Sequence, residues 1–230
     1  ASAAVLPLDM KAAASIVKRE NTRVAKLIGI NKAARTTCVK PAGTTSLVLG
    51  TSSGIHAWHN DYYIRRLRVG KNEAIYNYLK AYHPGLVKDE YFRPHDTAVI
   101  EIPQSAPKGS ILRTESAFDL LKRVKKVATE WVKPGHRKGS NTHNVSATIS
   151  LKEDDWKKAG EWMWDNRNYY NGLSVLPYDG GTYTQAPFED ITKKEFDKLV
   201  KHLHDINLEH VKEETDETDL SGELACAGGS

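Results

Sequence analysis

The residues best suited to chemistry lie in one short stretch, residues 40–46, which reads Lys-Pro-Ala-Gly-Thr-Thr-Ser. Pro41 fixes φ and lacks an N–H, and Gly43 lets the backbone approach a ligand closely. Three hydroxyl side chains follow where a helix would begin, and the free N–H groups of a helix N-terminus attract an anion. Lys40 adds a full positive charge. We therefore predict a phosphate-binding loop made of Pro41, Ala42, Gly43, Thr44, Thr45 and Ser46.

The same residue types have a simpler explanation. Thr and Ser are favoured N-caps, so the stretch is also what an ordinary capped helix start would look like. It is not a Walker A loop, because the G-x-x-x-x-G-K-[ST] spacing is absent. The chemistry of the residues alone leaves both interpretations open.

The segments on either side must position this loop. The β-prone run from Arg35 to Val39 leads into it, and the apolar run from Leu47 to Leu49 leaves it and ends at Gly50. We predict a strand, a tight turn and a short helix.

Residues 36–47 resemble the substrate-phosphate loop of ribonucleotide reductases, and the match is best to the adenosylcobalamin-dependent class. The resemblance continues in the family's order over nearly the whole chain, which makes the combination specific where the loop alone would not be. Its further segments are Gly54-Ile55-His56, Tyr62-Tyr63-Ile64-Arg65-Arg66, residues 171–183 and the tail residues 222–229.

The resemblance implies the C-terminal portion of the ten-stranded α/β barrel of these enzymes. The family reduces ribonucleotides to 2′-deoxyribonucleotides with a thiyl radical on a cysteine of an N-x-C-x-E motif, and that motif is absent here. We therefore expect the C-terminal part, or a split C-terminal subunit, of a reductase that is incomplete alone. Its implied partners are an N-terminal catalytic chain with the radical cysteine, a ribonucleotide di- or triphosphate and a thioredoxin-like reductant. Adenosylcobalamin would be held mainly by the missing part.

The chain has two cysteines, Cys38 and Cys226. In the family, a mobile C-terminal cysteine pair re-reduces the active site, and Cys226 fits the first position of that pair. The second position would fall beyond Ser230, and one thiol alone can form only a mixed disulfide. A stray exposed cysteine is the alternative for Cys226. Cys38, among apolar and Thr neighbours, is expected to be a small buried hydrophobe.

After His204 the composition changes to many acids and almost no large apolar side chains. Such a segment cannot bury enough surface to offset its ordering entropy. We predict a barrel part at residues 1–204 and a flexible acidic tail at 205–230.

Apolar periodicity predicts the remaining elements. A helix is expected at residues 9–28, with Ile16, Val17, Val24, Leu27 and Ile28 as its apolar stripe. Other helices are expected from residue 71 or 72 to about 82, after a cap at Thr114 or Ser116, after a capping box at Ser150 and Glu153, and after one at Thr192 and Glu195. Strands are expected at 62–69, 97–102, 145–151 and 173–176, which together indicate an α/β layout. The arginines at 65, 66 and 68 could clamp a phosphate or carboxylate, but surface arginines with buried stems are the simpler expectation for most of the three.

Composition limits the class of protein. The 230 residues are 40% hydrophobic with a net charge of +4, which suits a globular core and is too mild to indicate nucleic-acid binding. We expect no membrane segment, and two dissimilar cysteines favour a reducing, cytoplasmic location. Two other functions stay open, a stand-alone phosphate-ligand binding module and a structural partner that completes another chain's barrel.

Overall fold

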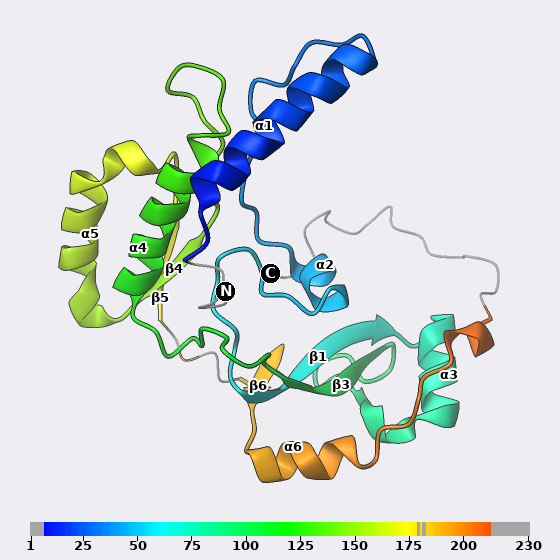
Figure 1. Ribbon diagram of the computed structural model, residues 1–230. Coiled ribbons are helices and arrows are strands. Elements are labelled where there is room, and N and C mark those ends of the chain that lie inside the picture. Colours follow the sequence, from blue (N-terminus) through cyan, green and yellow to red (C-terminus); the bar gives the residue numbers. More distant parts are fainter. Residues whose placement is uncertain (1–6, 179, 181–182, 213–230) are drawn as a thin grey trace. The chain divides into compact units, whose positions relative to one another are not determined.

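The computed structural model describes residues 7–178, 180 and 183–212. It is a mixed α/β structure of two compact units (Figure 1). The first unit comprises Ala1–Trp58 and Pro107–Gly180, and the second comprises His59–Ala106 and Gly181–Ser230. Neither unit corresponds to the predicted segments 1–204 and 205–230, and that division stays a prediction. Over the described residues, no helix combines the length and the apolar character that crossing a bilayer requires.

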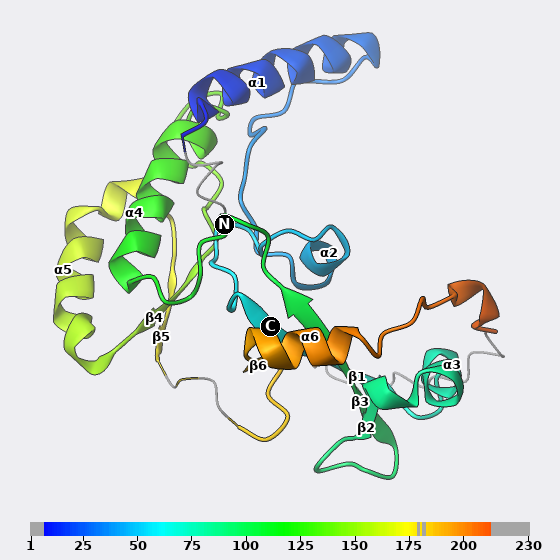
Figure 2. The same ribbon diagram turned by 60° about the horizontal axis from the view of Figure 1, so that its bottom comes forward.

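The first unit packs helices against a short parallel pair of strands. Its helices are α1 (Met10–Leu27), α2 (Gly43–Val48), α4 (Ala117–Val127) and α5 (Trp156–Asp165), and its strands are β4 (Thr148–Leu151) and β5 (Ser174–Pro177). Figures 1 and 2 show α4 and α5 side by side, next to the two strands. The core is the apolar face of α4 against β4, with Leu121, Val124, Ile149 and Leu151 almost fully buried.

Helix α4 forms where the sequence predicts it. Ser116 and Asp119 make a reciprocal capping box, which selects Ser116 over Thr114 as the cap. The helix then widens into one π-helical turn, Ala128–Val132, before Pro134. The alternation predicted for residues 145–151 is confirmed, because Val145, Ala147, Ile149 and Leu151 are all buried.

The second unit is an antiparallel sheet in the order β2-β3-β1-β6. The strands are β1 (Tyr62–Gly70), β2 (Val87–Asp89), β3 (Thr97–Ser105) and β6 (Phe188–Asp190), and the helices are α3 (Ala74–Tyr82) and α6 (Lys193–Val200). The predicted capping box of Thr192 and Glu195 starts α6. The core joins α3 to the sheet, through Val69, Tyr76, Tyr78, Leu79, Ala98 and Ile100.

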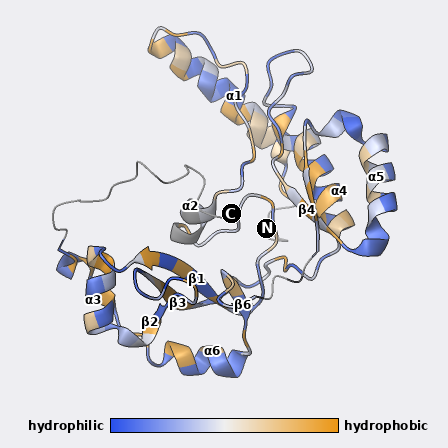
Figure 3. Ribbon diagram, turned by 180° about the vertical axis from the view of Figure 1, so that it is seen from behind, coloured by the Kyte–Doolittle hydropathy of each residue, from blue (hydrophilic) through white to orange (hydrophobic). Residues whose placement is uncertain are grey.

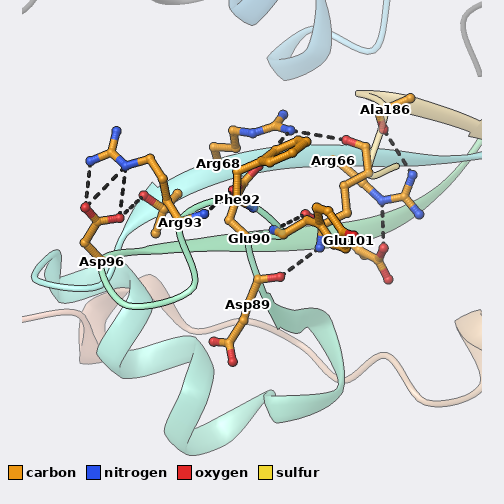
Figure 4. A network of polar contacts seen from close by, with 12 residues as sticks. Arg66, Arg68, Asp89, Glu90, Phe92, Arg93, Asp96, Glu101 and Ala186 are labelled. Atoms are coloured by element: carbon orange, nitrogen blue, oxygen red, sulfur yellow. Dashed lines mark hydrogen bonds and ion pairs between the residues drawn. The ribbon is translucent and has the colours of Figure 1, made fainter. Parts of the chain in front are cut away.

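Arg66 is the charged centre of this sheet, and the expectation of surface arginines is wrong for it. It is 8% exposed and donates to Glu101 Oε1 at 2.7 Å and to Ala186 O at 3.0 Å (Figure 4). It also donates to Glu189. Burial by itself raises the pKa of Glu101, but hydrogen bonds from Lys88 and Arg66 outweigh it and hold that pKa below its ordinary value.

Several predicted elements differ from the structure. β3 runs through Pro103 to Ser105, because β2 pairs only with Ala98–Ile100 and leaves the strand free of a second neighbour at the proline. Ser150 lies inside β4 and makes no capping box; α5 instead follows a 3-10 turn at Glu153–Asp155.

Three apolar faces that the sequence predicts are exposed to solvent in the structure. β5 was predicted to be buried, yet Leu176 is 52% exposed, since β5 pairs only with β4 in the described part of the chain. α6 has no buried residue. The predicted stripe of α1 is exposed as well, whereas Ala14 and Ala25 are the buried positions of that helix.

The predicted tail begins in the described residues and ends outside them. Residues 205–212 include a 3-10 turn at Leu208–His210, the N–H of Asn207 donates to Tyr78 Oη at 3.1 Å, and Val211 packs on the core of the second unit. Cys226 and the rest of residues 213–230 lie outside the described residues.

The ion pair of Arg66 predicts an acid-sensitive stability. Glu101→Gln should lower the free energy of unfolding by about 3 kcal/mol at pH 7, because it removes one partner of a buried pair. The folded-state pKa of Glu101 lies below the ordinary value of 4.5. The pair's contribution is therefore complete above pH 4.5 and is lost as the pH falls below it. Urea unfolding of the wild type and of Glu101→Gln should give free energies of unfolding whose difference narrows below pH 4.5. A difference in unfolding free energy that does not depend on pH would contradict this, and Glu161→Gln, at an exposed carboxylate of α5, is the control.

Candidate functional site

The segment that enters the predicted phosphate loop is extended but is not a strand. Residues 35–39 make only two isolated bridges, Arg35 with His136 and Val39 with Val145, so the predicted strand is wrong. Thr37 explains this, because its side chain turns inward and donates to the carbonyl groups of Trp131 at 2.8 Å and Val132 at 3.2 Å. These bonds tie the segment to the π-helical turn after α4 instead of to a neighbouring strand.

Gly135 makes this attachment possible. The N–H of Thr36 donates to Gly135 O at 3.1 Å, and the Thr36 hydroxyl donates to the same oxygen at 2.9 Å. A Cβ atom at position 135 would lie 1.9 Å from Thr37 Oγ1, far inside van der Waals contact. Only glycine therefore lets the two segments come this close.

Cys38 is exposed, and the expectation of a buried hydrophobe is wrong. Thr37 takes the inward position, so its neighbour faces out, while Cys38 O accepts a hydrogen bond from Trp131 Nε1 at 3.1 Å. The thiol lies immediately before the predicted loop in the sequence.

The loop itself turns into a short helix as predicted, with α2 beginning at Gly43. Gly43, Thr45 and Lys40 are exposed, whereas Ser46 is 7% exposed and its hydroxyl donates to Gly43 O at 2.9 Å. The first N–H groups of a helix, here those of residues 43–45, have no intrahelical acceptor. The loop thus presents backbone donors, the Thr45 hydroxyl and a lysine, while Ser46 stabilises the turn from inside.

The motif Gly54-Ile55-His56 packs against the backbone at the start of the loop. Gly54 has a φ of +58°, and a Cβ there would lie 3.3 Å from Lys40 O and from Pro41 N. His56 accepts from the Thr148 N–H at 3.0 Å through Nε2, so its Nδ1 carries the proton and donates to Ser53 O at 2.9 Å. The structural role that the sequence favours for His56 is confirmed.

Arg123 fixes the same motif from α4. It is 6% exposed and donates to Ile55 O at 2.9 Å and to both carboxylate oxygens of Glu115. Sequence reasoning missed this role, because a lysine- and arginine-rich helix usually directs such side chains to solvent. An acid eight residues before an arginine at a core-facing helical position is the only available signal.

Asn144 organises the resembling segment that begins at Asn171. Its side-chain oxygen accepts from the N–H groups of Asn171 at 3.2 Å and Gly172 at 3.4 Å, and its Nδ2 donates to Gly172 O at 2.8 Å. Sequence reasoning missed Asn144, since a lone asparagine in a polar loop carries no pattern. Residues 179, 181 and 182 of this segment lie outside the described residues.

Of the three arginines in β1, Arg65 is the one free to meet an anion. Its guanidinium carbon lies 4.2 Å from the ring centroid of Phe188, and among the described residues it has no hydrogen bond or ion pair. Burial lowers its pKa. Arg66 forms ion pairs with Glu101 and Glu189, and Arg68 contacts Glu90 at 3.4 Å.

The second unit also has an open cleft of about 430 Å³ between α3, the sheet and the end of α6. Its walls are mainly apolar, with His83, His202 and His204 on them. In the part of the chain that the structure describes, no group of three or more His, Cys, Asp or Glu residues is arranged to hold a metal ion.

Comparison with known proteins confirms the resemblance. No protein-family model matches the chain. The chain is 28% identical over 204 residues to the adenosylcobalamin-dependent ribonucleoside-triphosphate reductase of Euglena gracilis, covering 84% of this chain and 26% of that protein. It is 26% identical over 214 residues to the reductase of the same name from Lactobacillus leichmannii, covering 89% of this chain and 27% of that protein.

The fold matches as well. The crystal structure of a B12-dependent class II ribonucleotide reductase aligns with a TM-score of 0.69 at 24% identity, over 87% of this chain and 28% of that one. The chain is therefore similar over most of its length to adenosylcobalamin-dependent ribonucleotide reductases, and it spans 26–27% of the length of these two curated relatives.

Gly135 offers a test of how the loop is held. Gly135→Ala should lower the free energy of unfolding by about 1–3 kcal/mol, because the new methyl group overlaps Thr37. Chemical denaturation measures the change. Gly160→Ala is the matched control, since this exposed position in α5 has open space and should gain about 0.5–1 kcal/mol. Equal stability of wild type and Gly135→Ala would show that the segment at Thr37 is not held as described.

Proposed function

We propose that this chain is the C-terminal segment or subunit of a vitamin B12-dependent ribonucleotide reductase and supplies its substrate-phosphate loop. The observation that carries the proposal is the start of α2 at Gly43, within the segment that resembles the family's phosphate loop. In this proposal the loop of residues 41–46, Pro-Ala-Gly-Thr-Thr-Ser, forms the site for a phosphate of a ribonucleotide. The relatives' names point to a triphosphate.

The arrangement of donors supports phosphate binding. The unpaired N–H groups at the start of α2 attract negative charge, and the exposed Thr45 hydroxyl and Lys40 ammonium add a donor and a full charge. Ser46 acts differently from the other residues, because its hydroxyl already donates to Gly43 O. We assign Ser46 to holding the turn and the residues before it to the ligand.

The chain is incomplete in this proposal. It lacks the N-x-C-x-E motif, so the radical cysteine must come from the part of the reductase that the chain does not span. Adenosylcobalamin generates the radical when bound, and we assign its contacts mainly to that other part. What this chain does is bind and orient the substrate phosphate.

The strands of the first unit fit a place in a larger barrel. β4 and β5 pair in parallel with only each other among the described residues, and Leu176 of β5 is 52% exposed. Parallel strands are normally covered on both faces and extended by further strands. We propose that these two strands belong to the ten-stranded α/β barrel.

Reconstitution tests the proposal. The chain alone, with adenosylcobalamin and a dithiol, should reduce no ribonucleotide, and addition of the reductase polypeptide of the same source that carries the N-x-C-x-E motif should give reduction. Thr45→Val in that mixture should raise KM at least tenfold, because a hydrogen bond to a charged phosphate contributes about 1.5–3 kcal/mol.

Thr51→Val, just after α2, is the matched control and should leave KM unchanged. Reduction by the chain alone would refute the proposal that it is only part of a reductase. An active mixture in which Thr45→Val has the wild-type KM would refute the role of the loop. Phosphate binding without reduction by the mixture would favour the stand-alone binding module.

We further propose that Cys226 carries reducing equivalents from a thioredoxin-like protein to the active site. In this proposal the acidic residues of the predicted tail act as a tether for Cys226, and a flexible linker of about fourteen residues would reach about 20 Å. In the reconstituted enzyme with its full natural C-terminus, Cys226→Ser should abolish turnover with thioredoxin and leave turnover with a small dithiol largely intact. Small dithiols diffuse into the active site unaided. Equal loss with both reductants, or no loss with either, would contradict the proposed relay.

A further inference from the structure

Helix α1 exposes a stripe of large aliphatic side chains along most of its length. Figure 3 marks the apolar and polar positions of the helix by colour. Ile16 is 54% exposed, Leu27 70% and Ile28 61%, while Val17 and Val24 are each more than a third exposed. Single exposed aliphatic residues are common on protein surfaces, but several on one face of a helix are typical of an interaction site. The exposed carboxylate of Glu20 lies on the same face, among them. We call these five residues the α1 stripe.

The α1 stripe is not the face that holds the helix on its own unit. That face carries Ala14 and Ala25, which are buried, and Lys18, whose Nζ donates to Pro134 O at 3.3 Å and His136 O at 2.8 Å. Asn21 accepts from the Ala33 N–H at 2.9 Å on the same side. At 100° per residue the stripe lies directly beside this anchored face. The anchoring contacts therefore fix the helix with its stripe outward.

We propose that the α1 stripe is a docking surface for the part of the reductase that this chain does not span. This inference rests on the proposed function. The length of the relatives identifies the occupant, since the chain matches only 26–27% of them, and the structural relative is likewise covered over only 28% of its chain. The exposed β5 of the same unit is a second element without a complete set of neighbours.

The charged residues beside the α1 stripe indicate which charges the docked polypeptide should carry. Arg19, Arg23 and Lys26 border the stripe on the side away from the anchored face. Arg23 is paired with Glu20 of its own helix, whereas Arg19 and Lys26 have no ion pair among the described residues. An apolar strip with acidic side chains along one edge would match this surface, because opposite charges at an interface rim favour the correct register.

Binding of two separately produced polypeptides tests the proposal. This chain is titrated with the same-source polypeptide that carries the N-x-C-x-E motif, and the dissociation constant is measured by calorimetry. Ile16→Glu and Leu27→Glu should each weaken binding at least tenfold. Ser15→Glu, the same change on the polar face of α1, should leave it unchanged. All three sites are exposed, so circular dichroism should show folded variants with wild-type melting temperatures.

The outcomes separate this inference from the proposed function. If wild type neither binds the polypeptide nor gives reduction with it, the proposed function fails and the inference fails with it. If wild type binds and gives reduction while the stripe variants bind equally well, the docking surface alone is refuted. If sedimentation shows that the chain pairs with itself through the stripe and the variants are monomers that still bind the polypeptide, the occupant is a second copy and the inference is wrong.

Discussion

The attachment of one loop to one helix at two points organises the first unit. The π-helical turn after α4 accepts hydrogen bonds from Thr37 on the near side of the loop, and Arg123 of α4 donates to Ile55 O on the far side. Between these points Gly54 packs against the backbone of Lys40 and Pro41. The exposed donors at the start of α2 are thus held by a closed frame, which is what preorganised binding requires.

Burial of charge follows a consistent rule in both units. Arg123 and Arg66 are buried together with acids and backbone oxygens that accept hydrogen bonds from them, although Arg123 Nε has no partner among the described residues. Glu90, 5% exposed, accepts from the N–H groups of Phe92 and Arg93 and from Arg68. An unpaired buried charge would cost several kcal/mol, so such partners are a condition of folding. Arg65 departs from this rule, because Phe188 covers it without supplying an acceptor.

The sequence predicted the elements whose signals are local. The capping boxes at Ser116 and Thr192, the alternation from Val145 to Leu151 and the helix after Gly43 are all present. The predictions that failed depend on neighbours far away in the sequence. Cys38 is exposed because Thr37 bonds a turn more than ninety residues later, and the short strands β2 and β6 exist only through pairing with β3 and β1. Arg123 and Asn144 act through hydrogen bonds to residues distant in the sequence or to backbone groups, which produce no periodic pattern.

The exposure of the α1 stripe differs from the sequence prediction for another reason. The period of 3.6 residues is correct and the helix forms, yet the side chains that the pattern assigns to a core are exposed. Hydrophobic periodicity indicates that a helix has an apolar face, but it does not indicate which chain covers that face. The same holds for β5, where an apolar run forms a strand whose far side has no neighbour among the described residues. Two independent elements of one unit thus carry a pattern of burial that their own contacts do not account for. A chain that matches about a quarter of its relatives' length is where such a mismatch is expected.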